Sequence, residues 1–111
     1  MGIENETAEI IRFSHAELAW FRFALCVVQT RCEKEAAAAH VLRDSARVLL
    51  DRPQPLAEYS VVIPVSDLPL SIYAIQEGRC RTTQERKMRD ELLRRFFDIT
   101  GQRGPLDNSR R

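Results

Sequence analysis

The stretch SHAELAWFRFALCVVQTRCEKE, residues 14 to 35, decides the fold. Its apolar run from Leu18 to Val28 covers 11 positions and contains Arg22, whereas a membrane-spanning helix needs roughly 20 apolar residues. At about 100° per residue, the large side chains of this run surround almost the whole helix axis, which is typical of a helix covered on nearly all sides. We therefore expect a buried helix over residues 15–29 rather than a membrane anchor.

One narrow polar strip runs along one side of this predicted helix, and its residues do not indicate a catalytic or metal site. His15 and Cys26 would lie about 16 Å apart along the helix axis, so they cannot act together as base and nucleophile. A metal site needs three or four converging ligands, and the cysteines and histidines lack such spacing. We expect no metal and no cofactor, and we interpret the strip as the edge of a buried helix. Its residues are His15, Arg22, Cys26 and Gln29.

A second helix follows directly. Residues 14–17 and 30–33 both fit the capping box, in which a hydroxyl and a later carboxylate bind amide groups at a helix start. These signals predict helices over 15–29 and 31–51, and Pro53 ends the second. Two arrangements stay open: a pair that folds back on itself, or one long helix that would require a dimer. The apolar side of the second helix is predicted to hold Val41, Leu42, Val48, Leu49 and Leu50.

The next segment is rich in β-branched residues. EYSVVIPV, residues 58–65, predicts a strand, and LSIYAIQ, residues 70–76, predicts a second strand that pairs with it as a hairpin. The alternative is a short helix over 67–77 that ends at Gly78. EIIRF, residues 9–13, either adds a third strand or extends the first helix.

The last element is an amphipathic helix over about 83–98, which a third capping box at 82–85 begins and Gly101 ends. We find no internal repeat, and we expect one domain over 1–100 with a flexible tail over 101–111. The predicted fold class is α+β, with an apolar helical pair, a short antiparallel hairpin and this C-terminal helix. An all-α dimer built on one long helix is the alternative.

Charge is unevenly distributed along the 111 residues. Residues 1–78 hold 7 Lys and Arg against 11 Asp and Glu, whereas residues 79–111 hold 10 against 5. In the last helix, three (i, i+4) acid–base pairs would neutralise part of the basic charge: Glu85–Arg89, Asp90–Arg94 and Glu91–Arg95. The cations left near the helix start are the candidate binding residues for an acidic partner or for phosphates: Arg79, Arg81, Arg86 and Lys87.

The function predicted from these patterns is non-catalytic. Glycine-rich phosphate loops and serine-centred motifs are absent from the sequence, so we do not expect an enzyme. We expect a protein interaction or regulatory module that acts as a homodimer, with nucleic-acid binding as the alternative. An acidic protein partner is a further possibility, and we expect no membrane partner. The expected interface residues are Trp20, Phe21, Phe23, Val27 and Leu49.

The cysteines and the N-terminus bear on the compartment. Cys26, Cys32 and Cys80 make an odd number without the spacing of a secreted disulfide framework. The first residues are acidic and do not read as a signal peptide. The sequence therefore predicts a cytoplasmic protein.

Overall fold

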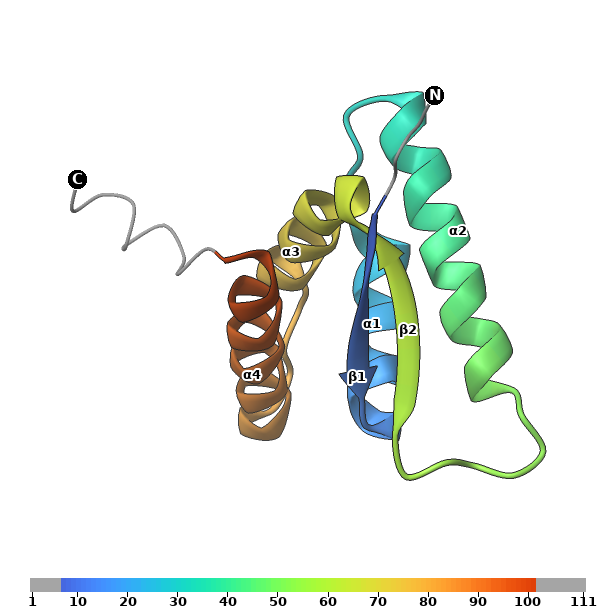
Figure 1. The fold of residues 1–111 in the computed structure, drawn as a ribbon. Coiled ribbons are helices and arrows are strands. Elements are labelled where there is room, and N and C mark those ends of the chain that lie inside the picture. The colour runs from blue at the N-terminus through green and yellow to red at the C-terminus, as the bar shows by residue number, and fades with distance from the viewer. Residues whose placement is uncertain (1–6, 102–111) are drawn as a thin grey trace.

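The computed structural model describes residues 7–101, and its strands form an antiparallel ribbon against which the helices pack (Figure 1). The predicted α+β fold class is confirmed. No helix within residues 7–101 combines the length and the apolar character that crossing a bilayer requires. The elements, in chain order, are β1 (Ala8–Phe13), α1 (His15–Val27), α2 (Glu33–Leu50), β2 (Tyr59–Pro64), a 3-10 turn (Val65–Asp67), α3 (Leu68–Glu77) and α4 (Thr83–Thr100).

The first two helices form the back-folded pair, since α1 ends at Val27 and α2 begins at Glu33 and packs against it. The capping box of Ser14 and Glu17 is confirmed, because the Glu17 amide donates to Ser14 Oγ at 3.1 Å and the Ser14 amide donates to Glu17 Oε1 at 2.8 Å. The capping box predicted at residues 30–33 is wrong. The N-cap of α2 is Cys32, whose side chain makes no capping hydrogen bond.

The partner of the β2 strand was predicted wrongly. Residues 70–76 belong to α3, so the alternative of a helix over 67–77 is the correct one. Its buried positions recur at the helical spacing of three and four residues, and the hydroxyl of buried Ser71 donates to the Asp67 carbonyl at 3.0 Å within the helix. The strand that pairs with β2 is β1, in a register that places Ile11 opposite Val61.

Contrary to the expectation of no repeat, the chain contains two βαα halves offset by 50 residues. The strands have 6 residues each, and α2 and α4 have 18 residues each. The start of α2 carries a hydrogen bond from the Arg31 amide to Glu35 at 2.8 Å, and α4 repeats it from Arg81 to Glu85 at 2.6 Å. Because Ile11 and Val61 also differ by 50, this pair lies on a pseudo-two-fold axis through the ribbon.

The two halves also bury most of the same positions. In α1 these are Leu18, Trp20, Phe21, Ala24 and Leu25, and in α3 they are Leu68, Leu70, Ser71, Ala74 and Ile75. In α2 and α4, Leu42 corresponds to Leu92 and Ala46 to Phe96, all buried. The symmetry is therefore one of backbone and burial.

The halves interlock rather than sit side by side. Helix α4 contacts β1 of the other half, and α2 contacts β2. At the first junction the rings of Phe13, Phe21 and Phe96 meet, with centroids 5.1 Å apart for Phe13 and Phe21, 6.2 Å for Phe13 and Phe96 and 5.8 Å for Phe21 and Phe96. The single core is thus assembled from both halves.

The outer surface of α2 differs from the sequence prediction. Val41 and Val48, expected on the apolar side, are 59% and 56% exposed, whereas Ala39, Leu42 and Ala46 face the core. The backbone at Gly101 has a positive φ of 78° and ends α4, as predicted. The rest of the predicted tail lies outside the described residues.

Candidate functional site

The ribbon has one face against the helices and one face open. Ile11, Phe13, Tyr59, Val61 and Ile63 fill the first face and are buried. The open face, seen in front of α1 in Figure 1, carries the alternate residues. Among these, Ile10 and Val62 are 60% and 61% exposed, because no helix in the described chain covers them. We call this surface the ribbon face; its residues are Ala8, Ile10, Arg12, Ser60 and Val62.

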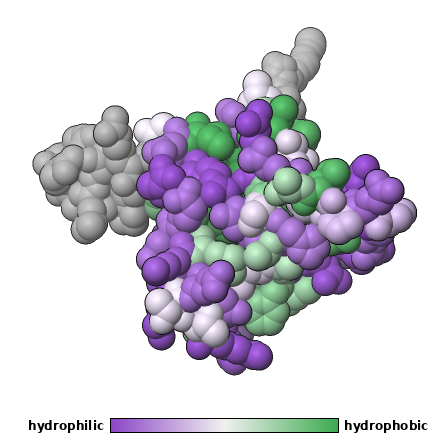
Figure 2. Space-filling view, turned by 90° about the horizontal axis from the view of Figure 1, so that it is seen from below, coloured by the Kyte–Doolittle hydropathy of each residue, from purple (hydrophilic) through white to green (hydrophobic). Residues whose placement is uncertain are grey.

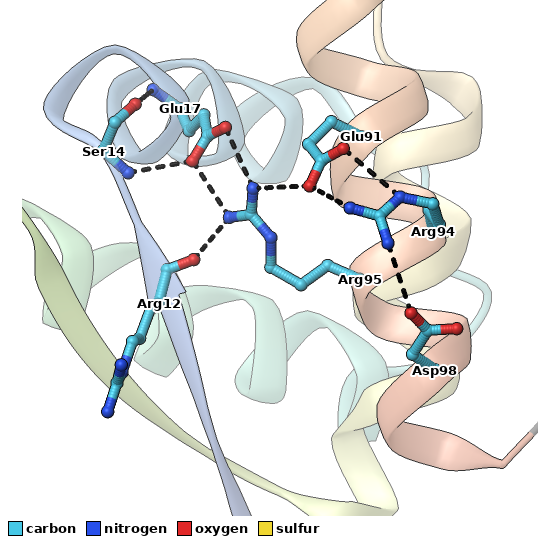
Figure 3. A network of polar contacts seen from close by, with 7 residues as sticks. All are labelled: Arg12, Ser14, Glu17, Glu91, Arg94, Arg95 and Asp98. Carbon is cyan, nitrogen blue, oxygen red and sulfur yellow. Dashed lines mark hydrogen bonds and ion pairs between the residues drawn. The ribbon is translucent and has the colours of Figure 1, made fainter.

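Side chains on the ribbon face meet across the strands in pairs. Ile10 lies opposite Val62, and Arg12 lies opposite Ser60. The Arg12 side chain is exposed and points away from the Arg95 network, while its carbonyl accepts a hydrogen bond from Arg95 (Figure 3). Because the guanidinium makes no ion pair within residues 7–101, it is available to a ligand.

The four predicted cations are exposed, and they lie between α3 and α4 and in the first turns of α4. We call them the basic cluster: Arg79, Arg81, Arg86 and Lys87. The structure gives none of their side chains an ion pair within the described chain. Of the three (i, i+4) pairs predicted to neutralise α4, only Glu91–Arg95 is present, at 3.0 Å. Arg94 instead pairs with Glu91 and Asp98.

The start of α4 lies against the start of α1. One surface hollow is lined jointly by Glu17 of α1 and by Thr83, Gln84 and Lys87 of α4. Since α1 follows β1 directly, Lys87 of the basic cluster lies near the end of the ribbon that carries Arg12, the lower end in Figure 1. Arg79 and Arg81 lie further along α1, where they line a hollow with Phe23 and Val27. Figure 2 shows this end of the molecule, where hydrophobic residues form separate patches among hydrophilic ones.

Arg95 fixes α4 to this end of the ribbon. Its guanidinium donates to Glu17 at 3.0 Å and 3.2 Å, to Glu91 at 3.0 Å, and to the Arg12 carbonyl (Figure 3). Burial raises the pKa of Glu17, but the hydrogen bonds from Arg95 and Ser14 outweigh it and hold that pKa below its ordinary value. The pKa of Glu91 is lowered by the hydrogen bonds from Arg95 and Arg94. This network therefore fixes the position of Arg12 relative to α1 and α4.

The start of α2, related to the basic cluster by the pseudo-two-fold, has different charges. Arg31 corresponds to Arg81, but its guanidinium is paired with Glu35 at 2.9 Å. That hydrogen bond lowers the pKa of Glu35 below its ordinary value. Glu33 adds a second carboxylate in the same turn, where α4 carries Thr83. Only one of the two related helix starts is thus basic.

The expected interface residues are divided by the structure. Trp20 and Phe21 are buried within the chain, and Leu49 is half-buried against the core. Phe23 and Val27 are exposed, and they line a hollow of about 480 Å³ together with Arg79 and Arg81 of the basic cluster. Two interface candidates therefore adjoin two binding candidates.

The polar strip of α1 is not brought together as a reactive site. The His15 ring lies 5.9 Å from the Tyr59 ring, and Cys26 is exposed on the following turns. Arg22 is half-buried, and its Nε has no hydrogen-bond partner within the described chain. No group of three or more potential metal ligands occurs among residues 7–101.

The ribbon face was missed at the sequence level. Its signal was the alternation of exposed and buried residues in 9–13, a segment that could equally extend a helix. Comparison with known proteins gives no family, no curated protein and no solved structure that matches this chain.

Proposed function

We propose that this chain binds duplex DNA by inserting the ribbon face into the major groove. The observation that carries the proposal is an antiparallel two-stranded ribbon, which within residues 7–101 has the helices on one side and exposed side chains on the other. The major groove of B-DNA is about 12 Å wide and admits a two-stranded β-ribbon, whose outward side chains then reach the base edges.

The symmetry of the ribbon supports the same proposal. Its pseudo-two-fold axis passes through the Ile11–Val61 pair, at the centre of the ribbon. The two antiparallel strands of a DNA duplex are also related by two-fold axes, and proteins with two-fold symmetry place equivalent elements on the two halves of a site. One chain with two βαα halves offers this arrangement without a second copy.

The basic cluster supplies the contacts that the backbone of DNA requires. All four of its residues are exposed, and Lys87 shares a surface hollow with Glu17 in the first turn of α1, next to the Arg12 end of the ribbon. Lys and Arg contacts to phosphates position a protein on the duplex and release counterions, whereas base contacts in the groove supply specificity. The ribbon face and the basic cluster thus divide these two tasks.

Binding to a fluorescently labelled duplex of mixed sequence, measured by anisotropy over a salt series, tests this function. Affinity is expected to fall steeply between about 50 and 200 mM salt. The slope of log K against log salt concentration should be about −0.9 for each phosphate contact. The triple variant Arg81→Gln, Arg86→Gln, Lys87→Gln should bind more weakly and with a shallower slope. The matched control is Arg31→Gln, because Arg31 occupies the position related to Arg81 but is paired with Glu35.

The absence of salt-sensitive binding at about 50 mM salt would contradict the proposal. An equal loss of DNA affinity in the triple variant and in Arg31→Gln would show that the basic cluster has no special part in binding. If an acidic peptide binds with the expected salt dependence and DNA does not, the cluster serves an acidic protein partner instead.

A second candidate function is protein docking through α2, with a second copy of this chain as the partner. Val41 and Val48 are exposed on α2 where the related positions of α4 hold the ion-paired Glu91 and Asp98. In an antiparallel contact centred near Ser45, Val41 of one copy would meet Val48 of the other. Light scattering should then give a dimer mass, and the variant Val41→Glu, Val48→Asp should give the monomer mass with an unchanged circular dichroism spectrum. A monomer mass for the native chain would exclude this candidate.

A further inference from the structure

The ribbon face is chemically divided at its pseudo-two-fold axis. The axis exchanges Ile10 with Ser60 and Arg12 with Val62, since each pair differs by 50 residues. It therefore exchanges the cross-strand pair Ile10–Val62 with the cross-strand pair Arg12–Ser60. One half of the ribbon face carries two aliphatic side chains, and the related half carries a cation and a hydroxyl.

We infer that the DNA site of this protein is not palindromic, an inference that rests on the proposed DNA binding. In the half-site under Arg12 and Ser60, the Arg12 guanidinium is placed to read a guanine. In the other half-site, Ile10 and Val62 are placed to contact thymine methyl groups. The backbone symmetry sets the position of the two half-sites, and the side chains make their sequences different.

The chemistry of the groove supports this assignment. A guanidinium donates two hydrogen bonds to O6 and N7 of guanine, and a serine hydroxyl binds either donors or acceptors. Aliphatic groups make no hydrogen bond, but they contact the C5-methyl group that only thymine presents in the major groove. An Ile–Val pair that is about 60% exposed on the ribbon therefore favours A·T pairs.

The charges beside the ribbon are asymmetric in the same direction. Lys87 of the basic cluster lies near the Arg12–Ser60 half, because it lines a surface hollow with Glu17 in the first turn of α1. The related start of α2 carries Lys34 together with Glu33 and the Arg31–Glu35 ion pair, so its charges balance. The half of the protein that would read guanine thus also has an exposed, unpaired Lys87 beside it that can hold a phosphate, which favours one orientation of the complex on its site.

Selection of binding sequences from a pool of randomised duplexes, with the full chain at about 50 mM salt, tests the inference. The native protein should enrich sites with a guanine in one half and thymines in the other, at a spacing symmetric about a centre. Arg12→Ala should lose discrimination at the guanine by about tenfold to a hundredfold and keep the thymine preference. Because the Arg12 side chain is exposed and makes no ion pair in the described chain, the Arg12→Ala variant should unfold at the same midpoint as the native protein.

A symmetric variant supplies the matched control. Ile10→Ser together with Val62→Arg copies the Arg12–Ser60 pair onto the other half of the ribbon. This variant should enrich palindromic sites with a guanine in both halves. Enrichment of palindromes by the native protein, or binding without any sequence preference, would overturn the inference while leaving DNA binding intact. Failure of the native protein to bind any duplex would instead refute the proposed function itself.

Discussion

Gly78 is the position at which the packing between the two halves leaves no space for a side chain. A Cβ atom built on Gly78 would lie 2.7 Å from Cη2 and Cζ2 of Trp20 and 3.2 Å from the Ala74 carbonyl oxygen. The Trp20 ring is only 5% exposed, and its Nε1 donates to the Arg79 carbonyl at 3.0 Å. The ring therefore cannot move away without losing that hydrogen bond.

The substitution Gly78→Ala should destabilise the protein by about 1–2 kcal/mol. Overpacking of a well-packed core costs about 1–3 kcal/mol. A smaller gain of about 0.4–1 kcal/mol opposes it, because alanine restricts the unfolded chain and adopts the φ of −66° and ψ of 142° found at this position without strain. In a domain of this size each kcal/mol corresponds to roughly 4–8 °C in Tm.

A double-mutant cycle tests the stated cause. The positions related to Trp20 and Gly78 are Leu70 and Val28, so the other half combines a smaller side chain with a larger one. Trp20→Leu alone should destabilise by about 2 kcal/mol or more through the cavity it leaves. Combined with Gly78→Ala, it should cost less than the sum by about 1 kcal/mol. Urea unfolding followed by circular dichroism measures all four proteins, and additivity within about 0.5 kcal/mol would refute the steric explanation.

Three further predictions concern the helix ends and the Arg95 network. Glu17 has a lowered pKa in the folded state, so its contribution to stability is complete above the ordinary value of 4.5 and is lost as the pH falls through the lowered value. As the pH falls through this window, the urea midpoint should fall less for Glu17→Gln than for the native protein. Parallel curves of urea midpoint against pH would contradict this prediction. Gly101→Ala should cost about 1 kcal/mol in thermal unfolding, because a side chain there meets no atom within 4 Å but requires a φ of +78°; an unchanged Tm would show that α4 frays without cost. Thr82→Ala removes a capping hydrogen bond of 3.0 Å and should lower the free energy of unfolding by about 1 kcal/mol. Cys32→Ala, at the related N-cap of α2, should change it by less than about 0.5 kcal/mol. Equal effects of the two substitutions would contradict the capping assignment.

Local signals in the sequence predicted the helices that have strong caps. Ser14 with Glu17, and Thr82 with Gly101, mark the bounds of α1 and α4 to within about two residues. Residues 70–76 were mistaken for a strand because Ile72, Tyr73 and Ile75 have high β propensity. Tertiary packing decided the outcome, since the buried positions of that segment follow the helical period and its one buried hydroxyl is satisfied within the helix.

The repeat and the ribbon face could not be predicted, and both failures have the same physical origin. The halves share a pattern of burial, but apolar positions accept residues of very different size, such as Trp20 and Leu70. Across residues 8–50 and 58–100 the identical residues are only Leu18, Ala24, Arg31, Glu35 and Leu42 with their counterparts. Pairing of β1 with β2 joins residues that are about half the chain apart in sequence, which no local pattern reveals.

The same divergence in the core explains why the two halves need one another. Phe13, Phe21 and Phe96 meet at one junction, and the residues related to them are Ile63, Ser71 and Ala46. If two copies of residues 8–50 paired with each other, a cavity would form beside each Ala46, where Phe96 is missing. If two copies of residues 58–100 paired, a cavity would form beside each Phe96, where the rings of Phe13 and Phe21 are missing. Each missing ring would cost several kcal/mol of stability. Pairing of unlike halves is therefore strongly favoured, and it is fixed within one chain. Because that order is fixed, the outer surfaces can differ without loss of stability, and the polar half of the ribbon stays at the same end of the molecule as Lys87.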